Sequence, residues 1–162
     1  MTRALVAGSA ILVLPLFGLP PDGEDKKLPD QAKAVLDKAS EYTLYSLEPS
    51  EKADGENALH GWKVLGKTTV KEAEARKKLL SALEKNIAEG KRGAKCFDPR
   101  HAIRATLDGK AVDLLICFEC GWVYVYHDGK QLARLEMDTA GQPDFDKVLR
   151  DAGVPLAKKR NE

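Results

Sequence analysis

Apolar residues recur at helical spacing through the middle of the chain, with Arg, Lys and Glu between them. From residue 79 to residue 87 they return every three or four positions, which predicts an amphipathic helix. Thr69 with Glu72 three residues later matches a capping box, so we expect the helix to begin after Thr69. Gly90 is expected to close it in a left-handed turn. One face of this helix should therefore be buried and the other exposed to solvent.

Two shorter stripes predict a helix at each end of the chain. Asp30 is placed to cap a first helix with a modest apolar stripe at residues 34–39. Pro143 is a favourable first residue for a last helix, which presents Phe145 and Leu149 on one side and ends at Gly153. Two or three helices are thus expected.

Elsewhere the apolar pattern is that of strands, with short branched or aromatic runs between turn residues. The runs cover residues 42–47, 60–66, 101–107, 111–118, 122–127 and 131–137. Asp108-Gly109 and Asp128-Gly129 are strong hairpin signals because both central residues must take positive φ. The sequence therefore predicts a single α+β domain in which an antiparallel meander sheet of about four to six strands is packed by helices.

The first residues have the layout of a secretory leader. A short basic start is followed by an uncharged, apolar run to Leu19, which is short for a membrane span of roughly 20 residues. We therefore expect a signal peptide at 1–19, although no Ala-x-Ala marks its cleavage site, then a linker at 20–28, the domain at 29–157 and a charged tail at 158–162. The protein is expected to be exported to the periplasm or beyond; an uncleaved anchor and a cytoplasmic chain are the alternatives.

Composition supports one soluble domain without indicating its partner. The chain has 162 residues, of which 43% are hydrophobic and 31% charged, which is ordinary for a folded protein. Lys and Arg number 26 against 25 Asp and Glu, so the net charge is only +1. We accordingly expect no nucleic acid partner, and no membrane span once the leader is removed. A protein of the cell envelope is the remaining candidate partner.

The three cysteines are the clearest chemical feature of the chain. Cys117 and Cys120 form a CxxC pair between two predicted strands and are followed by Gly121. This context resembles the knuckle of zinc ribbons, and it differs from a thioredoxin-like site, where CxxC opens a helix. Cys96 makes the number odd, so an exported chain has at most one internal disulfide and one thiol left over.

His101 extends the cysteine pattern toward a metal site. Together with the cysteines it gives C-x4-H-x15-C-x2-C, and these ligand types suit zinc. The three interpretations are a disulfide with one remaining Cys, a zinc site made of Cys96, His101, Cys117 and Cys120, and three reduced structural cysteines. The disulfide is favoured narrowly because exported thiols tend to oxidise, and the other two stay open.

Two further hypotheses use neighbouring residues. A thiol-dependent enzyme would pair Cys96 or Cys117 with His101 and orient the imidazole with Asp98 or Asp113, but no recognised signature supports it and we assign no catalytic residue.

Five cations between residues 91 and 104 instead suggest an anion-binding module centred on Arg100 and Arg104. A solvated loop at a helix end is the more common explanation for such a run. The tryptophans and tyrosines of the strands are interpreted as core and cross-strand pairs in preference to a ligand groove.

Four segments together resemble a family of small exported bacterial proteins for which no activity is known. They are YTLYSLEP at 42–49, HGWKVLGK at 60–67, CFDPRHAIR at 96–104 and ICFEC at 116–120. The resemblance covers most of the chain that follows the leader, and it implies export and a single domain without implying a reaction. The sequence thus favours a non-catalytic binding or structural module of the cell envelope.

Overall fold

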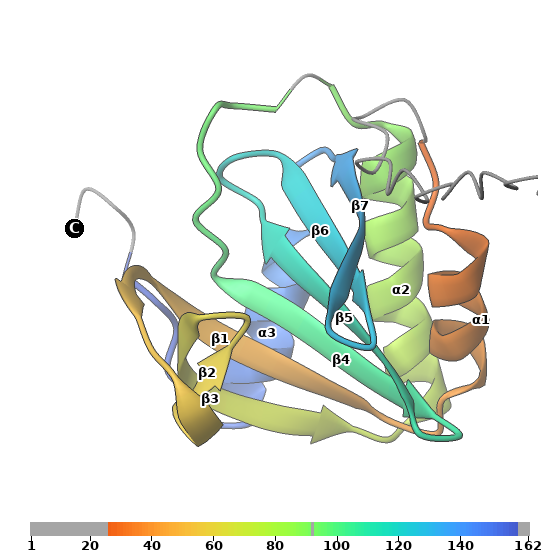
Figure 1. Ribbon diagram of the computed structural model, residues 1–162, viewed down its shortest axis with the longest axis horizontal. Coiled ribbons are helices and arrows are strands. Elements are labelled where there is room, and N and C mark those ends of the chain that lie inside the picture. Colours follow the sequence, from red (N-terminus) through yellow and green to blue (C-terminus); the bar gives the residue numbers. More distant parts are fainter. Residues whose placement is uncertain (1–25, 92, 159–162) are drawn as a thin grey trace, which may run out of the picture.

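The computed structural model describes residues 26–91 and 93–158; the expected leader at 1–19, most of the linker and residues 159–162 lie outside them. Within the described residues one antiparallel sheet of seven strands carries three α-helices on one face (Figure 1). The elements follow in the order α1 (Asp30–Lys38), β1 (Tyr42–Lys52), a 3-10 turn η1 (Gly55–Asn57), β2 (Ala58–Leu59), β3 (Trp62–Val70), α2 (Ala73–Ala88), β4 (His101–Leu107), β5 (Lys110–Cys117), β6 (Trp122–His127), β7 (Lys130–Glu136) and α3 (Gln142–Asp151).

The strands lie in the order β2-β3-β1-β4-β5-β6-β7. β1 and β3 pair as an antiparallel hairpin, and after α2 the chain returns to pair β4 with the free side of β1. β4 to β7 then follow as the expected meander. The α+β class is confirmed, and the sheet has more strands than the four to six expected, because a two-residue strand such as β2 leaves no period in the sequence.

Two local expectations at strand and helix ends were wrong. β1 does not end with the expected run at 42–47 but continues through Pro49 to Lys52. Its register with β3 is irregular there, so the missing proline N–H costs no regular ladder bond. Thr69 lies inside β3 opposite Thr43, and α2 begins without a side-chain cap. Sheet pairing therefore overrides the local capping signal.

Gly90 has a role different from the one expected. It is absent from the positive-φ glycines, so it does not close α2 in a left-handed turn. A Cβ on Gly90 would lie 2.6 Å from the carbonyl oxygen of Glu136. Glycine is needed here because the end of α2 lies directly against the end of β7.

Both Asp-Gly hairpin predictions are confirmed. Asp108 and Gly109 have φ of 50° and 77°, and Asp128 and Gly129 have φ of 48° and 76°. A third turn of this kind joins β2 to β3 at residues 60–61, where His60 has φ 48°. This dipeptide lies in the run at 60–66 that was expected to be a strand.

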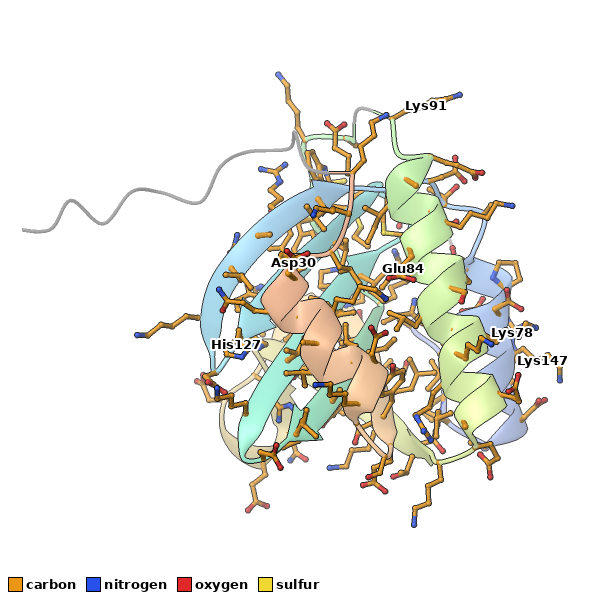
Figure 2. All side chains as sticks on the ribbon, turned by 90° about the vertical axis from the view of Figure 1, so that its right-hand side faces the viewer. Asp30, Lys78, Glu84, Lys91, His127 and Lys147 are labelled. Carbon is orange, nitrogen blue, oxygen red and sulfur yellow. A yellow bond between two sulfur atoms is a disulfide. The ribbon has the colours of Figure 1, made fainter. Side chains whose placement is uncertain are left out.

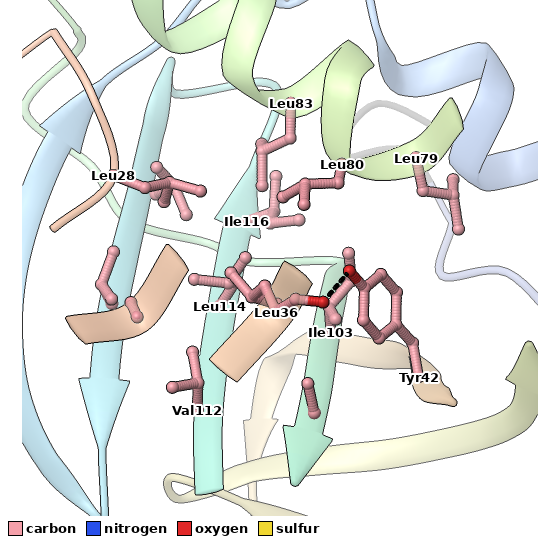
Figure 3. Packing of buried hydrophobic residues seen from close by; sticks show 14 of the residues in the cluster. Leu28, Leu36, Tyr42, Leu79, Leu80, Leu83, Ile103, Val112, Leu114 and Ile116 are labelled. Carbon is pink, nitrogen blue, oxygen red and sulfur yellow. Dashed lines mark hydrogen bonds between the residues drawn. The ribbon is translucent and has the colours of Figure 1, made fainter. Parts of the chain in front are cut away.

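The main core lies between the sheet and the helices (Figure 3). Alternate residues of the strands, such as Val112, Leu114 and Ile116 of β5, point toward the helices and are fully buried. The hydroxyl of Tyr42 donates to the carbonyl oxygen of Leu36 at 2.7 Å, so this buried polar group is satisfied. The helical face therefore holds the fold together.

Charged residues lie on the outer sides of the helices (Figure 2). Ion pairs between Lys33 and Glu84, at 2.7 Å, and between Lys78 and Asp144, at 2.8 Å, connect α1 to α2 and α2 to α3. Such exposed pairs contribute little stability each. Among the described residues, 26–91 and 93–158, no helix is long and apolar enough to cross a bilayer.

The opposite face of the sheet carries an aromatic cluster. Tyr45, Trp62, Tyr124 and Tyr126 project from the strands there and pack around Leu115. Their alternation with residues of the main core explains why both faces of β6 are bulky. The cysteines lie at one end of this second face, beside Trp122.

Candidate cysteine centre

The connection from α2 to β4 brings Cys96 and Asp98 to the sheet, and we call its residues 93–100 the crossing segment (Figure 1, the green connection). The Ala94 N–H donates to the carbonyl oxygen of Cys120 at 2.9 Å, and the indole N–H of Trp122 donates to the carbonyl oxygen of Ala94 at 2.6 Å. Gly93 is packed so closely that a Cβ would lie 2.5 Å from the Trp122 ring. Backbone and indole contacts therefore fix the start of the segment.

An aromatic side chain anchors the middle of the crossing segment. Phe97 stacks on Tyr124 with ring centroids 3.6 Å apart, and it meets Trp62 edge-on at 6.3 Å. Such pairs favour a defined ring orientation. Because Phe97 lies between Cys96 and Asp98 in the chain, its anchoring holds both of those side chains near the sheet.

The other half of the centre is the turn between β5 and β6. The Cys120 N–H donates to Sγ of Cys117 at 3.1 Å, and Gly121 takes a left-handed φ of 69° directly after it. Cys117 ends β5 and Trp122 begins β6, so the pair lies in a strand–turn–strand knuckle, as the sequence predicted. In this setting a backbone donor stabilises negative charge on sulfur.

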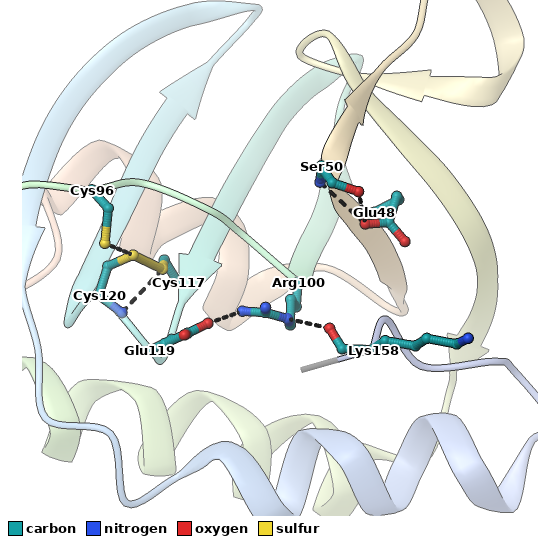
Figure 4. A network of polar contacts seen from close by, with 8 residues as sticks. All are labelled: Glu48, Ser50, Cys96, Arg100, Cys117, Glu119, Cys120 and Lys158. Carbon is teal, nitrogen blue, oxygen red and sulfur yellow. Dashed lines mark hydrogen bonds and ion pairs between the residues drawn. A yellow bond between two sulfur atoms is a disulfide. The ribbon is translucent and has the colours of Figure 1, made fainter. Parts of the chain in front are cut away.

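The three sulfur atoms meet at this turn (Figure 4). Cys117 and Cys120 form a disulfide, and Sγ of the remaining thiol, Cys96, lies 2.6 Å from Sγ of Cys120. Cys117 and Cys120 are only 1% and 2% exposed, whereas Cys96 is half-buried. A carboxylate oxygen of Asp98 lies within 4.8 Å of the sulfurs of both Cys96 and Cys120. We call these four residues the cysteine centre.

The donor set of the cysteine centre fits a thiophilic divalent cation. Three thiolates and one carboxylate are the number and type of ligands that close a tetrahedral zinc site. The disulfide form cannot supply them, because two of the sulfurs are bonded to each other. Metal binding here therefore requires reduction of the Cys117–Cys120 bond.

His101, the expected fourth ligand, lies elsewhere. It is 2% exposed, its Nε2 is 2.7 Å from Oδ1 of Asp146 on α3, and it meets Phe118 and Phe145 edge-on. It is not among the ligand atoms that gather within 4.8 Å at the cysteine centre. The cause is the alternation of the strands: residues 101, 103 and 105 of β4 face the helices, while Cys117 faces away from them.

The His101–Asp146 pair is a buried polar link between the sheet and α3. Burial raises the pKa of Asp146, but the hydrogen bond from His101, helped by its charge and that of Arg150, outweighs burial and leaves the pKa below its usual value. Since Nε2 of His101 is held by Asp146, His101 does not pair with a cysteine, and the arrangement that a thiol-dependent enzyme would need is not formed by these residues.

Asp113 is engaged in a different cluster, on the aromatic face. Its Oδ1 accepts from Nε of Arg104 at 2.6 Å and its Oδ2 from Nη2 at 2.7 Å, and His60 Nε2 lies 2.8 Å from the same Oδ2. Burial raises the pKa of Asp113, but the hydrogen bonds from Arg104 and His60 outweigh it and lower the pKa. His60 also stacks on Tyr126 at 3.8 Å. Asp113 thus organises Arg104 and His60 and does not orient His101.

His60 is a site residue that the sequence pattern does not reveal. It contacts Asp113 across 53 positions of sequence, so no local spacing reveals the pair. The available signal was the His-Gly dipeptide between two strands, because a non-glycine residue in the left-handed region marks a constrained turn.

The two arginines expected to hold an anion are each paired with a carboxylate. Arg100 forms an ion pair with Glu119 and donates to the carbonyl oxygen of Lys158 at 3.3 Å (Figure 4). Arg104 is held in a bidentate pair by Asp113. Each positive charge is therefore offset by an adjacent negative one, and the two arginines have different partners.

Comparison of the chain with protein-family models, with curated proteins and with solved structures found no match.

Proposed function

We propose that this chain is a non-catalytic module of the bacterial cell envelope in which the reduced cysteine centre holds one zinc ion. The observation that carries the proposal is the convergence of three sulfurs and one carboxylate from two chain segments, the crossing segment and the β5–β6 turn. Cysteines without a shared role would not be expected to lie together beside an aspartate. Cys96, Asp98, Cys117 and Cys120 are the proposed ligands.

A zinc ion with four protein ligands is a structural cross-link with no position left for substrate. Here it would join the crossing segment to the sheet beside Trp122. Other contacts already hold the crossing segment to the sheet, since Phe97 stacks on Tyr124 and the Ala94 N–H is hydrogen-bonded to Cys120. The module would therefore present a fixed aromatic face.

Metal binding is tested with the purified, fully reduced chain, dialysed against zinc and then against a weak chelator. We expect one zinc per chain and protection of all three thiols from alkylation. C96S should lose the stoichiometric zinc, and D98N should bind it at least tenfold more weakly. D54N is the matched control, because Asp54 is exposed and lies on a loop outside the centre. Equal affinity of D98N and wild type would remove Asp98 from the ligand set, and absence of zinc from wild type would end the proposal.

A further variant distinguishes this ligand set from the C-x4-H pattern. If Asp98 is the fourth ligand, H101Q should retain zinc even if it is less stable, because His101 is bonded to Asp146 on the other face. Loss of zinc from a folded H101Q chain would favour the original pattern.

Placement in the envelope is supported by the expected leader at 1–19 and by the resemblance to small exported bacterial proteins. It is tested by fractionating bacteria that express the full chain and measuring the mass of the product. A product shortened by the leader and recovered from the envelope fraction is expected. The intact chain in the cytosol would contradict this part of the proposal.

A further inference from the structure

We propose that Cys96 exchanges with the buried Cys117–Cys120 disulfide, so that Cys120 is shared between two alternative partners. Of the three cysteines, Cys96 is the one that reaches solvent, while Cys117 and Cys120 are almost completely buried. Its Sγ is 2.6 Å from Sγ of Cys120, which puts the thiol in direct contact with one sulfur of the bond (Figure 4).

The exchange is a thiol–disulfide substitution that needs no added oxidant or reductant. The Cys96 thiolate attacks Sγ of Cys120, the Cys96–Cys120 bond forms, and the Cys117–Cys120 bond breaks. The electron pair of the broken bond leaves on Sγ of Cys117, and the proton given up by Cys96 is returned there. One disulfide and one thiol are present before and after the step.

The geometry favours Cys117 as the leaving group. The Cys120 N–H already donates to Sγ of Cys117 at 3.1 Å, so a backbone donor is in place when negative charge develops on that sulfur. The contacts that hold the crossing segment are made by Ala94 and Phe97, not by a cysteine side chain. They therefore keep Cys96 beside Cys120 whichever disulfide is present.

The consequence is a route for reduction of a bond that solvent does not reach. In the exchanged form one sulfur of the disulfide is Cys96, and an external thiol can attack there. The exchange itself is independent of metal. Only its further consequence rests on the proposed function: reduction through Cys96 would free the three thiolates that bind zinc.

The first test uses the oxidised, metal-free full chain. After equilibration at pH 8 the exchange is quenched with acid, the chain is unfolded in acidic urea so that every thiol is accessible, and the free thiol is alkylated with N-ethylmaleimide. The chain is then digested without reductant, and the labelled cysteine is identified by mass spectrometry. Exchange predicts label on Cys96 in some chains and on Cys117 in others, with none on Cys120. Label on Cys96 alone, or any substantial label on Cys120, would overturn the proposal.

The second test measures how fast dithiothreitol reduces the disulfide. C96S should be reduced at least tenfold more slowly than wild type, because its remaining disulfide is buried. K95S is the matched control, since it changes the adjacent residue of the same segment and keeps the thiol. Equal reduction rates for C96S and wild type would refute the proposed reduction through Cys96. A chain that exchanges without binding zinc would refute only the proposed function, and the reverse result would refute only this inference.

Discussion

The two disulfides available to Cys120 close chain loops of very different length. Cys96 and Cys120 are 24 positions apart, whereas Cys117 and Cys120 are three apart. A cross-link restricts the unfolded chain more when it closes a longer loop, and the chain-entropy relation gives about 3.5 kcal/mol for the longer loop and about 1.9 kcal/mol for the shorter one. C117S and C96S, which can each form only one of these bonds, should therefore differ measurably.

The assay is urea unfolding of each variant in its oxidised and reduced forms. Each reduced form is the reference for its own oxidised form, so the cost of the serine substitution cancels. Oxidation should raise the free energy of unfolding of C117S by about 1.6 kcal/mol more than that of C96S. This is roughly a fifteenfold difference in the unfolding equilibrium constant. C120S, in which neither bond can form, should show no gain.

If oxidation stabilises C117S against urea no more than it stabilises C96S, the loop-length explanation is refuted. Failure of C117S to close a disulfide under air would be equally damaging, because it would show that Cys96 and Cys120 do not meet in the folded chain. Thiol counting before each unfolding experiment identifies which of these outcomes has occurred.

Three other substitutions test the surrounding structure. D113N should lower the free energy of unfolding by about 2–3 kcal/mol, a figure reduced from the buried-pair range because Arg104 is 40% exposed. Folding lowers the pKa of Asp113, so its contribution to wild-type stability should be fully present above pH of about 4 and should decline as the pH falls through the folded pKa. Urea titrations at several pH values should show a smaller decline for D113N. Y42F should cost about 1 kcal/mol by loss of one buried hydrogen bond. Burial raises the pKa of Tyr42 to about 12, so absorbance should show this phenol ionising last and wild-type stability falling above the ordinary pKa of about 10. G90A should cost about 1–3 kcal/mol in thermal unfolding, because its Cβ would meet the Glu136 carbonyl.

The features predicted correctly are those that a short stretch of sequence determines. Asp-Gly at 108–109 and 128–129 allows few conformations other than a tight hairpin, and the apolar stripe of α2 repeats for several turns. Thr69 failed as a cap because its position in β3 depends on Thr43, which is distant in sequence. Local signals were therefore reliable only where no distant strand competed for the same backbone.

The cysteine centre was predictable in part for the same reason. Cys117, Cys120 and Gly121 form a local turn, and the placement of the pair between two strands follows from the local sequence. The choice between Asp98 and His101 depends on which face of the sheet each side chain occupies, and this becomes known only when β4 is placed against β1 and β5.

The central claim is that three sulfurs and one carboxylate of this chain form a metal site. Zinc X-ray absorption of the reduced, zinc-loaded chain tests it most directly. We predict three sulfur ligands at about 2.3 Å and one oxygen ligand at about 2.0 Å. A spectrum with fewer than three sulfur ligands, or one that shows an imidazole in place of the oxygen, would contradict the account.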